Sequence, residues 1–153
     1  MSSNKIGTLG VMVCRKPGFP PFGEKEFLRE LSSKAKELGM QVFVFCPDDA
    51  SPASGVESSI DRIQGYHFIP GEGWSFGTFP PPDVIYDRCL HRNGEETAAA
   101  GECLNRMLQQ GVRLWSRGLP GKQKVHQLLK RSSALRPYLP ATLSYAGAES
   151  LSR

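Results

Sequence analysis

The fold is decided by two apolar stretches, IGTLGVMV at residues 6–13 and QVFVFC at residues 41–46. Each is short and bounded by Gly, Pro or polar residues, which predicts a buried strand. Between them, residues 24–38 have carboxylates first, lysines last and apolar side chains at helical spacing, which predicts a helix. Its expected inner face consists of Phe27, Leu28, Leu31, Ala35 and Leu38. Gly39 can take the left-handed conformation that closes the helix. A strand, a helix and a strand in this order indicate a parallel unit.

A hairpin and a short strand are expected next. Residues 66–69 and 74–79 flank a turn that contains Gly71 and Gly73, which favours paired antiparallel segments. The spacing of these glycines resembles a dinucleotide loop only loosely, and no strand leads into a helix there, so a turn is the better interpretation. Three prolines then end the ladder, and residues 83–87 predict a short core strand.

The remaining chain predicts two helices and two strands. Residues 93–111 begin with a capping pattern and end at glycine, which predicts a helix. Its expected inner face consists of Cys103, Leu104, Met107 and Leu108. Residues 112–115 and 140–145 predict strands, and residues 122–135 a helix that must end before Pro137. The predicted fold class is therefore α/β: an open, mainly parallel sheet with helices on both faces, then a linker helix and strand.

Composition bounds the class of protein. A chain of 153 residues is long enough for one domain with a core. Its 39% apolar and 22% charged residues are ordinary for a globular protein. No apolar run approaches the roughly 20 residues that a membrane-spanning helix needs, and the polar N-terminus does not resemble an export signal. We therefore expect a cytoplasmic protein without a membrane partner.

Charge is distributed unevenly. Residues 1–103 carry 10 Lys/Arg against 14 Asp/Glu, whereas residues 104–153 carry 9 Lys/Arg against Glu149 alone. Such a basic segment attracts phosphates or an acidic partner surface. Because no nucleic-acid motif accompanies it and aromatics are not interleaved with the basic residues, we expect no nucleic-acid partner.

Four cysteines are spaced too widely for a CxxC motif. In a cytoplasmic chain a disulfide is disfavoured, so we expect small buried hydrophobic side chains. A zinc or redox site is the alternative, because Cys14, Cys46 and Cys89 each fall at the end of a predicted strand.

Two sets of polar residues are candidates for binding. Arg15, Asp87 and Arg88 follow or end predicted strands and are expected to share one rim, where the forked arginines suit a carboxylate or phosphate. The alternative for Asp87 and Arg88 is an ordinary surface salt bridge. Lys122 and Lys124 open the third helix, where free backbone N–H groups also suit a phosphate, the alternative being a solvated helix end.

Three stretches together resemble a known family. They are residues 9–13, residues 82–88, and residues 121–142 with their Gly-Lys-Gln-Lys start and Tyr-Leu-Pro-Ala-Thr end. In order and spacing the chain resembles the N-terminal part of the endospore coat-associated YheC/YheD proteins of the ATP-grasp superfamily. Two departures are that Gly121 stands where an acidic or amide residue is usual, and that the later lobes are missing.

The resemblance implies a domain plan and a site. Residues 1–120 would form a Rossmann-like pre-ATP-grasp domain, and residues 121–153 the linker helix and the start of a truncated ATP-grasp lobe. Lys122 or Lys124 would reach the phosphates of ATP, with Mg completing the site in a whole protein. Because only Glu149 is acidic after residue 103, we expect no tight Mg-ATP site and no catalysis from this chain alone.

Partners and localisation follow from the same resemblance. It implies a downstream ATP-grasp lobe as partner, association with the spore, and a substrate-side and interdomain role in an ATP-dependent ligase. Without a following lobe, apolar residues after residue 137 would be exposed and favour self-association. The alternative is a stand-alone α/β module that binds an anionic ligand or protein partner through its basic C-terminal segment.

Overall fold

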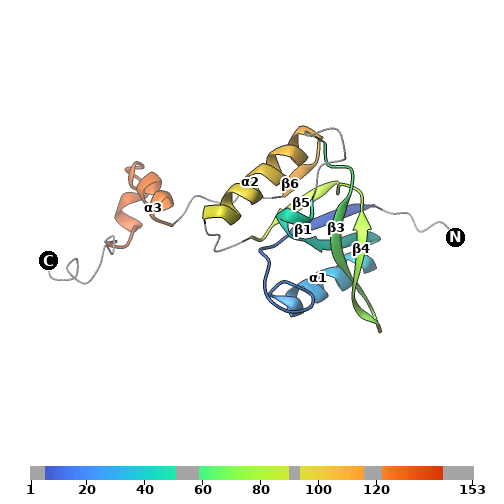
Figure 1. Ribbon diagram of the computed structural model, residues 1–153. Coiled ribbons are helices and arrows are strands. Elements are labelled where there is room, and N and C mark those ends of the chain that lie inside the picture. The colour runs from blue at the N-terminus through green and yellow to red at the C-terminus, as the bar shows by residue number, and fades with distance from the viewer. Residues whose placement is uncertain (1–5, 51–58, 90–93, 116–121, 143–153) are drawn as a thin grey trace. The chain divides into compact units, whose positions relative to one another are not determined.

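The structure is a computed structural model that describes residues 6–50, 59–89, 94–115 and 122–142. Contacts divide the chain into two compact units, Met1–Ser116 and Arg117–Arg153. The first unit is a mixed α/β domain built on a six-stranded sheet (Figure 1). Its elements, in chain order, are β1 (Gly7–Met12), α1 (Lys25–Glu37), β2 (Met40–Phe45), a 3-10 turn (Pro47–Asp49), β3 (Ile63–Ile69), β4 (Gly73–Phe79), β5 (Val84–Asp87), α2 (Gly94–Gln109) and β6 (Arg113–Trp115).

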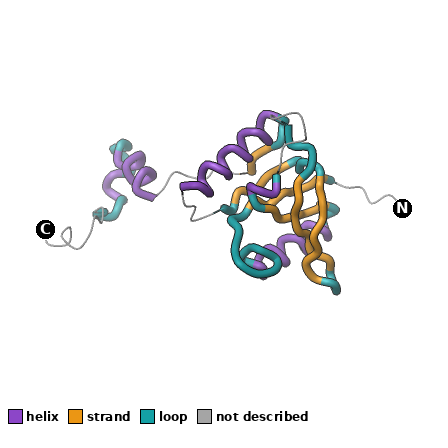
Figure 2. The backbone as a smooth tube through the Cα atoms, in the orientation of Figure 1, coloured by secondary structure: helices purple, strands orange, loops and turns teal. Residues whose placement is uncertain are grey.

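The strand order is β4-β3-β2-β1-β5-β6, which leaves the sheet open at both edges (Figure 2). β1 lies parallel to β2 on one side and to β5 on the other, and β6 extends the parallel part beyond β5. β3 joins β2 antiparallel, and the β3–β4 hairpin forms the other edge. The predicted open, mainly parallel sheet is thus confirmed, with an antiparallel hairpin added at one edge.

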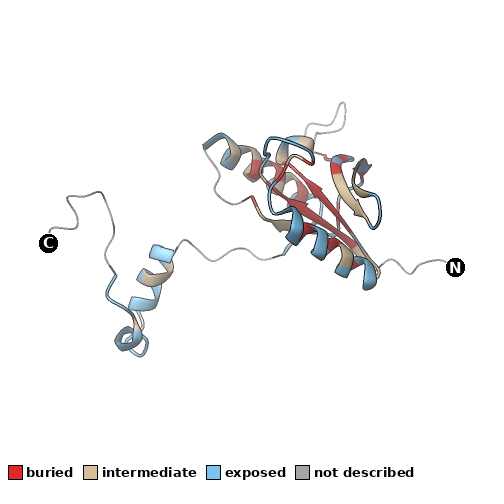
Figure 3. Cartoon of the chain, turned by 90° about the horizontal axis from the view of Figure 1, so that it is seen from below, coloured by how far each residue is buried: buried red, intermediate tan, exposed pale blue. Residues whose placement is uncertain are grey.

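One helix covers each face of the sheet. On one face Leu28 and Ala35 of α1 join a buried cluster with Leu9 and Val11 of β1. On the other face, a second buried cluster joins α2 to the opposite side of β1 and β2. It contains Ala100, Cys103 and Met107 of α2, Met12 of β1, and Phe43 and Phe45 of β2. Alternate side chains of β1 therefore enter opposite clusters, and the middle of the sheet is the most buried part of the unit (Figure 3).

The helix predictions hold with three corrections to their inner faces. Gly39 closes α1 at a φ of 75°, and Gly111 follows α2 at a φ of 87°, as their positions predicted. Three residues expected on inner faces are exposed: Phe27 by 40%, Leu38 by 65% and Leu108 by 37%. The buried face of α2 consists of Ala100, Cys103 and Met107, which lie on one stripe of the helix, and Leu108 lies outside this stripe.

The hairpin prediction is confirmed. β3 and β4 pair over seven positions, from Ile63↔Phe79 to Ile69↔Gly73, and Gly71 and Gly73 adopt φ values of 89° and 94° in the turn. The glycine-rich stretch is therefore a hairpin turn, and it leads into no helix. β4 forms the edge of the sheet, and none of its residues is charged.

The second unit contains α3 (Lys122–Lys130) and a 3-10 turn (Arg136–Tyr138), with no buried residue among residues 122–142. The helix was predicted to reach residue 135, but it ends earlier, where the amides of Arg131 and Ser132 bond back three residues. The serine pair that follows Arg131 favours such an end, because serine competes for backbone groups. Pro137 lies within the 3-10 turn. Residues 140–142 form no strand, and the rest of that predicted strand lies outside the described residues.

A substitution at Gly65 tests how closely β3 approaches β2. A Cβ at Gly65 would lie 2.8 Å from the carbonyl oxygen of Val44, whereas one at Gly101 of α2 would meet nothing within 4 Å. Gly65→Ala should lower the free energy of unfolding by about 1–3 kcal/mol, because the backbone must move. Gly101→Ala, the matched control, should raise it by about 0.5–1 kcal/mol through helix propensity. Urea unfolding followed by circular dichroism measures both; equal effects of the two changes would contradict the close approach.

Candidate functional site

A cavity of about 210 Å³ lies at the carboxyl ends of β1, β2 and β5. Residues that follow these strands line it together with the first turns of α2, and they are Cys14, Arg15, Cys46, Pro47, Asp48, Cys89, Glu95, Glu96 and Ala99. Ligands of open α/β sheets bind at this edge, so the cavity is the candidate site of the first unit. The predicted meeting of strand ends is therefore observed for β1, β2 and β5.

Arg15 lies at this cavity and is held by the 3-10 turn that follows β2. Its Nη2 donates to Oδ1 of Asp49 at 2.6 Å, and the other oxygen of Asp49 accepts from the amide of Cys46 at 3.0 Å. Burial alone would lower the pKa of Arg15, but the hydrogen bond and charge of Asp49 outweigh it and hold the pKa above its ordinary value. The Arg15 side chain keeps 46% of its surface exposed, so its charge stays available to a ligand.

Arg88 is held away from this cavity, against α1. Its Nε and Nη2 donate to the two carboxylate oxygens of Glu24 at 3.1 and 2.5 Å, and Nη1 donates to the hydroxyl of Tyr86 at 2.9 Å. The guanidinium also lies 4.7 Å from the centre of the Phe27 ring. Hydrogen bonds to Glu24 and Tyr86 raise the pKa of Arg88. Of the predicted rim residues, Arg15 and Arg88 are therefore not brought together.

Asp87 ends β5 and shapes the turn that follows. Its Oδ1 accepts from the amide of Cys89 at 3.0 Å. In the β1–β5 register Asp87 stands beside Met12, which belongs to the cluster under α2. Asp87 thus points to the α2 side of the sheet while Arg88 binds on the α1 side, because consecutive residues of a strand alternate between faces.

A disulfide joins Cys14 and Cys89, whose Cα atoms are 4.7 Å apart. The expectation that disulfides are absent is wrong. The register explains the pairing: Met12 stands beside Asp87, and two residues further along both parallel strands Cys14 stands beside Cys89. The sequence placed both cysteines at strand ends, but only the strand order β1-β5 makes them neighbours.

The other two cysteines are buried thiols, as expected. Burial raises the pKa of Cys46 and of Cys103 to about 12, so both stay protonated at neutral pH. Within the ranges that the structure describes, no group of three or more His, Cys, Asp or Glu side chains is placed to hold a metal ion.

Lys122 and Lys124 lie in the first turn of α3, and both are exposed. They belong to the second unit, which also carries Lys130, Arg131 and Arg136. Between residues 122 and 142 the sequence has no acidic side chain, so these charges have no internal counter-ion within that stretch.

A second, larger cavity of about 590 Å³ lies at the amino ends of the strands, which sequence reasoning did not anticipate. Asp83 is its acidic lining residue, and Oδ2 of Asp83 accepts from the amide of Thr8 at 2.7 Å. Because this carboxylate braces β1 against β5, we assign it a structural role and keep the carboxyl-end cavity as the candidate site.

Together these features define the first unit as a mixed α/β domain with a polar, disulfide-bearing cavity at its strand ends. No protein-family model matches the chain. The endospore coat-associated protein YheC of Bacillus subtilis strain 168 is 28% identical over 130 residues, which are 84% of this chain and 34% of that protein. The chain thus spans about a third of the length of this curated relative and is distantly related to it. Among the described helices, none is long and apolar enough to cross a membrane.

The disulfide should contribute measurably to stability. Reduction with a phosphine should lower the free energy of unfolding by about 2–4 kcal/mol, because the disulfide closes a long loop in the unfolded chain. The variant with both Cys14→Ser and Cys89→Ser should show the lower value with and without the phosphine. An unchanged urea midpoint in wild-type protein whose Cys14 and Cys89 have been shown to be reduced would contradict this.

The Arg88–Glu24 pair should act as a structural brace. Arg88→Ala should lower the free energy of unfolding by about 1–2 kcal/mol, since it removes partly buried charge-assisted bonds and ring packing. Arg29→Ala, which removes an exposed pair with Glu26 one turn into α1, should change it by less than about 0.5 kcal/mol. A double-mutant cycle with Glu24→Gln, read by urea unfolding, should give a non-zero coupling; additive effects would show that the pair does not brace the fold.

Proposed function

We propose that this chain is the N-terminal portion of a YheC-like protein of the ATP-grasp type, an ATP-dependent carboxylate ligase in its complete form. The observation that carries the proposal is the relationship to YheC, which extends over 84% of the chain and 34% of the relative. The first unit would be a Rossmann-like pre-ATP-grasp domain that forms the substrate-side wall and interdomain surface. By the name of the relative, we also propose an association with the endospore coat.

The cavity at the strand ends would receive the substrate. Arg15 offers an exposed guanidinium with a raised pKa, which suits a carboxylate or phosphate. Asp87 and Arg88 border the same strand end and remain candidates. For Arg88 to bind substrate, a ligand carboxylate would have to replace Glu24, because both donor sides of the guanidinium already face Glu24 and Tyr86.

The start of α3 would contact ATP. Lys122 and Lys124 are exposed beside the free backbone N–H groups of a helix start, a setting that suits phosphate oxygens. Mg requires oxygen ligands, and residues 122–142 carry no carboxylate, so these residues fit the phosphates and do not fit the metal. ATP would supply a transferable phosphoryl group, and a downstream lobe would provide the Mg ligands as well as cover for the exposed apolar residues of this segment.

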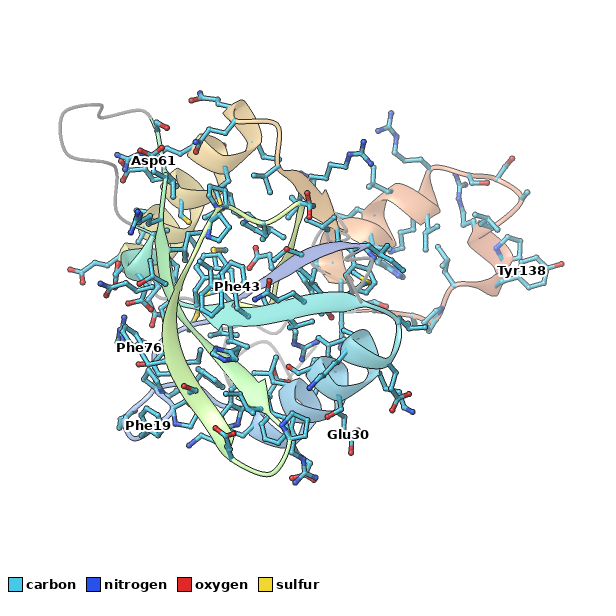
Figure 4. All side chains as sticks on the ribbon, turned by 90° about the vertical axis from the view of Figure 1, so that its right-hand side faces the viewer. Phe19, Glu30, Phe43, Asp61, Phe76 and Tyr138 are labelled. Carbon is cyan, nitrogen blue, oxygen red and sulfur yellow. A yellow bond between two sulfur atoms is a disulfide. The ribbon has the colours of Figure 1, made fainter. Side chains whose placement is uncertain are left out.

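A stand-alone binding module is the second candidate function. It is favoured by the composition of the second unit, where five basic side chains and exposed Leu128, Leu129, Leu135 and Tyr138 occur without an acidic residue between positions 122 and 142. Figure 4 shows Tyr138 projecting from this segment. A surface of this kind suits an acidic protein partner or another anionic ligand.

A chimera separates the two candidates. The matched third of Bacillus subtilis YheC is replaced by this chain, and Mg-ATP binding is measured by isothermal titration. We expect binding by the chimera, none by the 153-residue chain alone, and a loss of about tenfold or more with Lys122→Ala and Lys124→Ala, since each removes a contact to phosphate. Lys130→Ala, at the other end of the same helix, is the control.

Three outcomes would contradict the proposal. Tight Mg-ATP binding by the chain alone would show that it is complete without another lobe. A chimera that folds but does not bind Mg-ATP, when YheC itself does, would favour the stand-alone module. Equal losses with Lys130→Ala and the two first-turn substitutions would assign the effect to general charge and not to the helix start.

A further inference from the structure

The sheet opens between the first half of β2 and the second half of β3. The β2–β3 ladder consists of one pair, Val44↔Tyr66, although both strands continue beyond it. Figure 4 shows the two strands diverging, with α1 below the opening. A cavity of about 240 Å³ lies there, lined by residues 40–42 of β2, residues 67–69 of β3, and Ser32 and Lys36 of α1. The proposed ATP-grasp role does not use this cavity.

The backbone groups on the two sides of the opening belong to Val42 and Phe68. The carbonyl of Phe45 bonds to the chain that continues β1, so the N–H and C=O groups of Val44 and Val42 face β3, because successive residues of a central strand bond to opposite neighbours. Val44 pairs with Tyr66 on that side, so the N–H and C=O groups of Phe68, two residues further on, face β2. Val42 and Phe68 themselves form no pair of the ladder. A ligand in the opening would therefore meet backbone donors and acceptors that need partners.

The side chains at the opening combine one cation with apolar surface. Of the described residues that line the cavity, Lys36 is charged and none is acidic. Lys34 on the same helix pairs with Glu37 at 2.8 Å, whereas Lys36 forms no ion pair within the described residues. Met40 and Phe68 are partly buried, so each keeps apolar surface that a ligand can cover. The cavity thus offers a positive charge, apolar side chains, and backbone donors and acceptors.

We propose that this cavity binds a small apolar α-amino acid of about the size of leucine. The ligand carboxylate accepts from the ammonium group of Lys36 and from a backbone N–H, and the ligand ammonium donates to the carbonyls of Val42 and Phe68. The apolar side chain of the ligand covers Met40 and Phe68. A volume of about 240 Å³ is below the roughly 300–1,000 Å³ of pockets for drug-sized ligands, which suits a ligand this small.

An amino acid is favoured over simpler ligands because it matches all of these groups. A carboxylate without an amine leaves the two carbonyls without a donor, and an amine without a carboxylate leaves Lys36 without a counter-ion. A ligand with both charges but no side chain leaves the apolar surface in water. The site rests on neither the relationship to YheC nor the strand-end cavity, so its test is separate from that of the ATP-grasp role.

The first experiment locates the binding. Nitrogen-15-labelled protein of the full 153 residues is titrated with L-leucine and followed by heteronuclear NMR. The amide signals of Val42 and Phe68 should shift together and saturate, with a Kd of about 1 mM or tighter for a ligand of this size. No saturable shift, or shifts confined to residues outside the cavity, would overturn the proposal.

Analogues of leucine test each group of the ligand in turn. Leucinamide lacks the carboxylate, 4-methylpentanoate lacks the amine, and glycine lacks the side chain. All are titrated at mildly acidic pH, where the amines are protonated. Each analogue should bind about fivefold or more weakly than leucine, because each leaves one set of groups in the cavity unmatched. Binding of any one of the three as tight as that of leucine would overturn the assignment to an apolar amino acid.

Matched lysine variants complete the test. Lys36→Gln should weaken leucine binding by about fivefold or more and leave leucinamide binding unchanged, since leucinamide has no carboxylate for Lys36 to bind. Lys34→Gln, which removes an exposed lysine of the same helix outside the cavity lining, should change leucine binding by less than about twofold. Equal effects of the two variants would assign the binding to the general charge of α1 and overturn the role of this cavity. Unchanged amide spectra outside the cavity would show that both variants are folded.

Discussion

The parallel register of β1 between β2 and β5 is the constraint on which the rest of the first unit depends. Gly7–Met12 bonds to a strand on each side and packs a helix on each face, so nearly all of β1 is buried. Its register with β5 also aligns the residues beyond the strand ends. Cys14 comes beside Cys89 by that alignment, and the residues that follow the strands line the cavity at the strand ends.

Local patterns in the sequence were sufficient to predict most elements of the sheet and both of its helices. Apolar runs marked β1 and β2, and Gly39, Gly71 and Gly111 marked turns that adopt positive φ. Local patterns did not predict the burial of side chains that depends on residues distant in the sequence. Leu108 is apolar at helical spacing yet exposed, because the sheet beneath α2 accepts the narrower stripe of Ala100, Cys103 and Met107.

The candidate site was likewise predicted only in part from the sequence. Sequence reasoning placed Arg15, Asp87 and Arg88 at strand ends, which is where they lie. It could not assign them to faces, and the partner of Arg88 is 64 residues away in the chain, at Glu24. The disulfide was missed for a related reason, since its two cysteines become neighbours only once β5 is known to lie next to β1. Strand order is a property of the whole sheet, and no short motif encodes it.

The edge strand β4 has a consequence for how the protein behaves in concentrated solution. Its residues Gly73–Phe79 contain no lysine, no acid and no proline, the features by which natural sheets discourage an incoming strand. Phe76 on this strand is 51% exposed (Figure 4). No described strand pairs with the outer side of β4, so a strand of another chain can add there. This route to fibrous aggregates depends on neither the disulfide nor the basic segment.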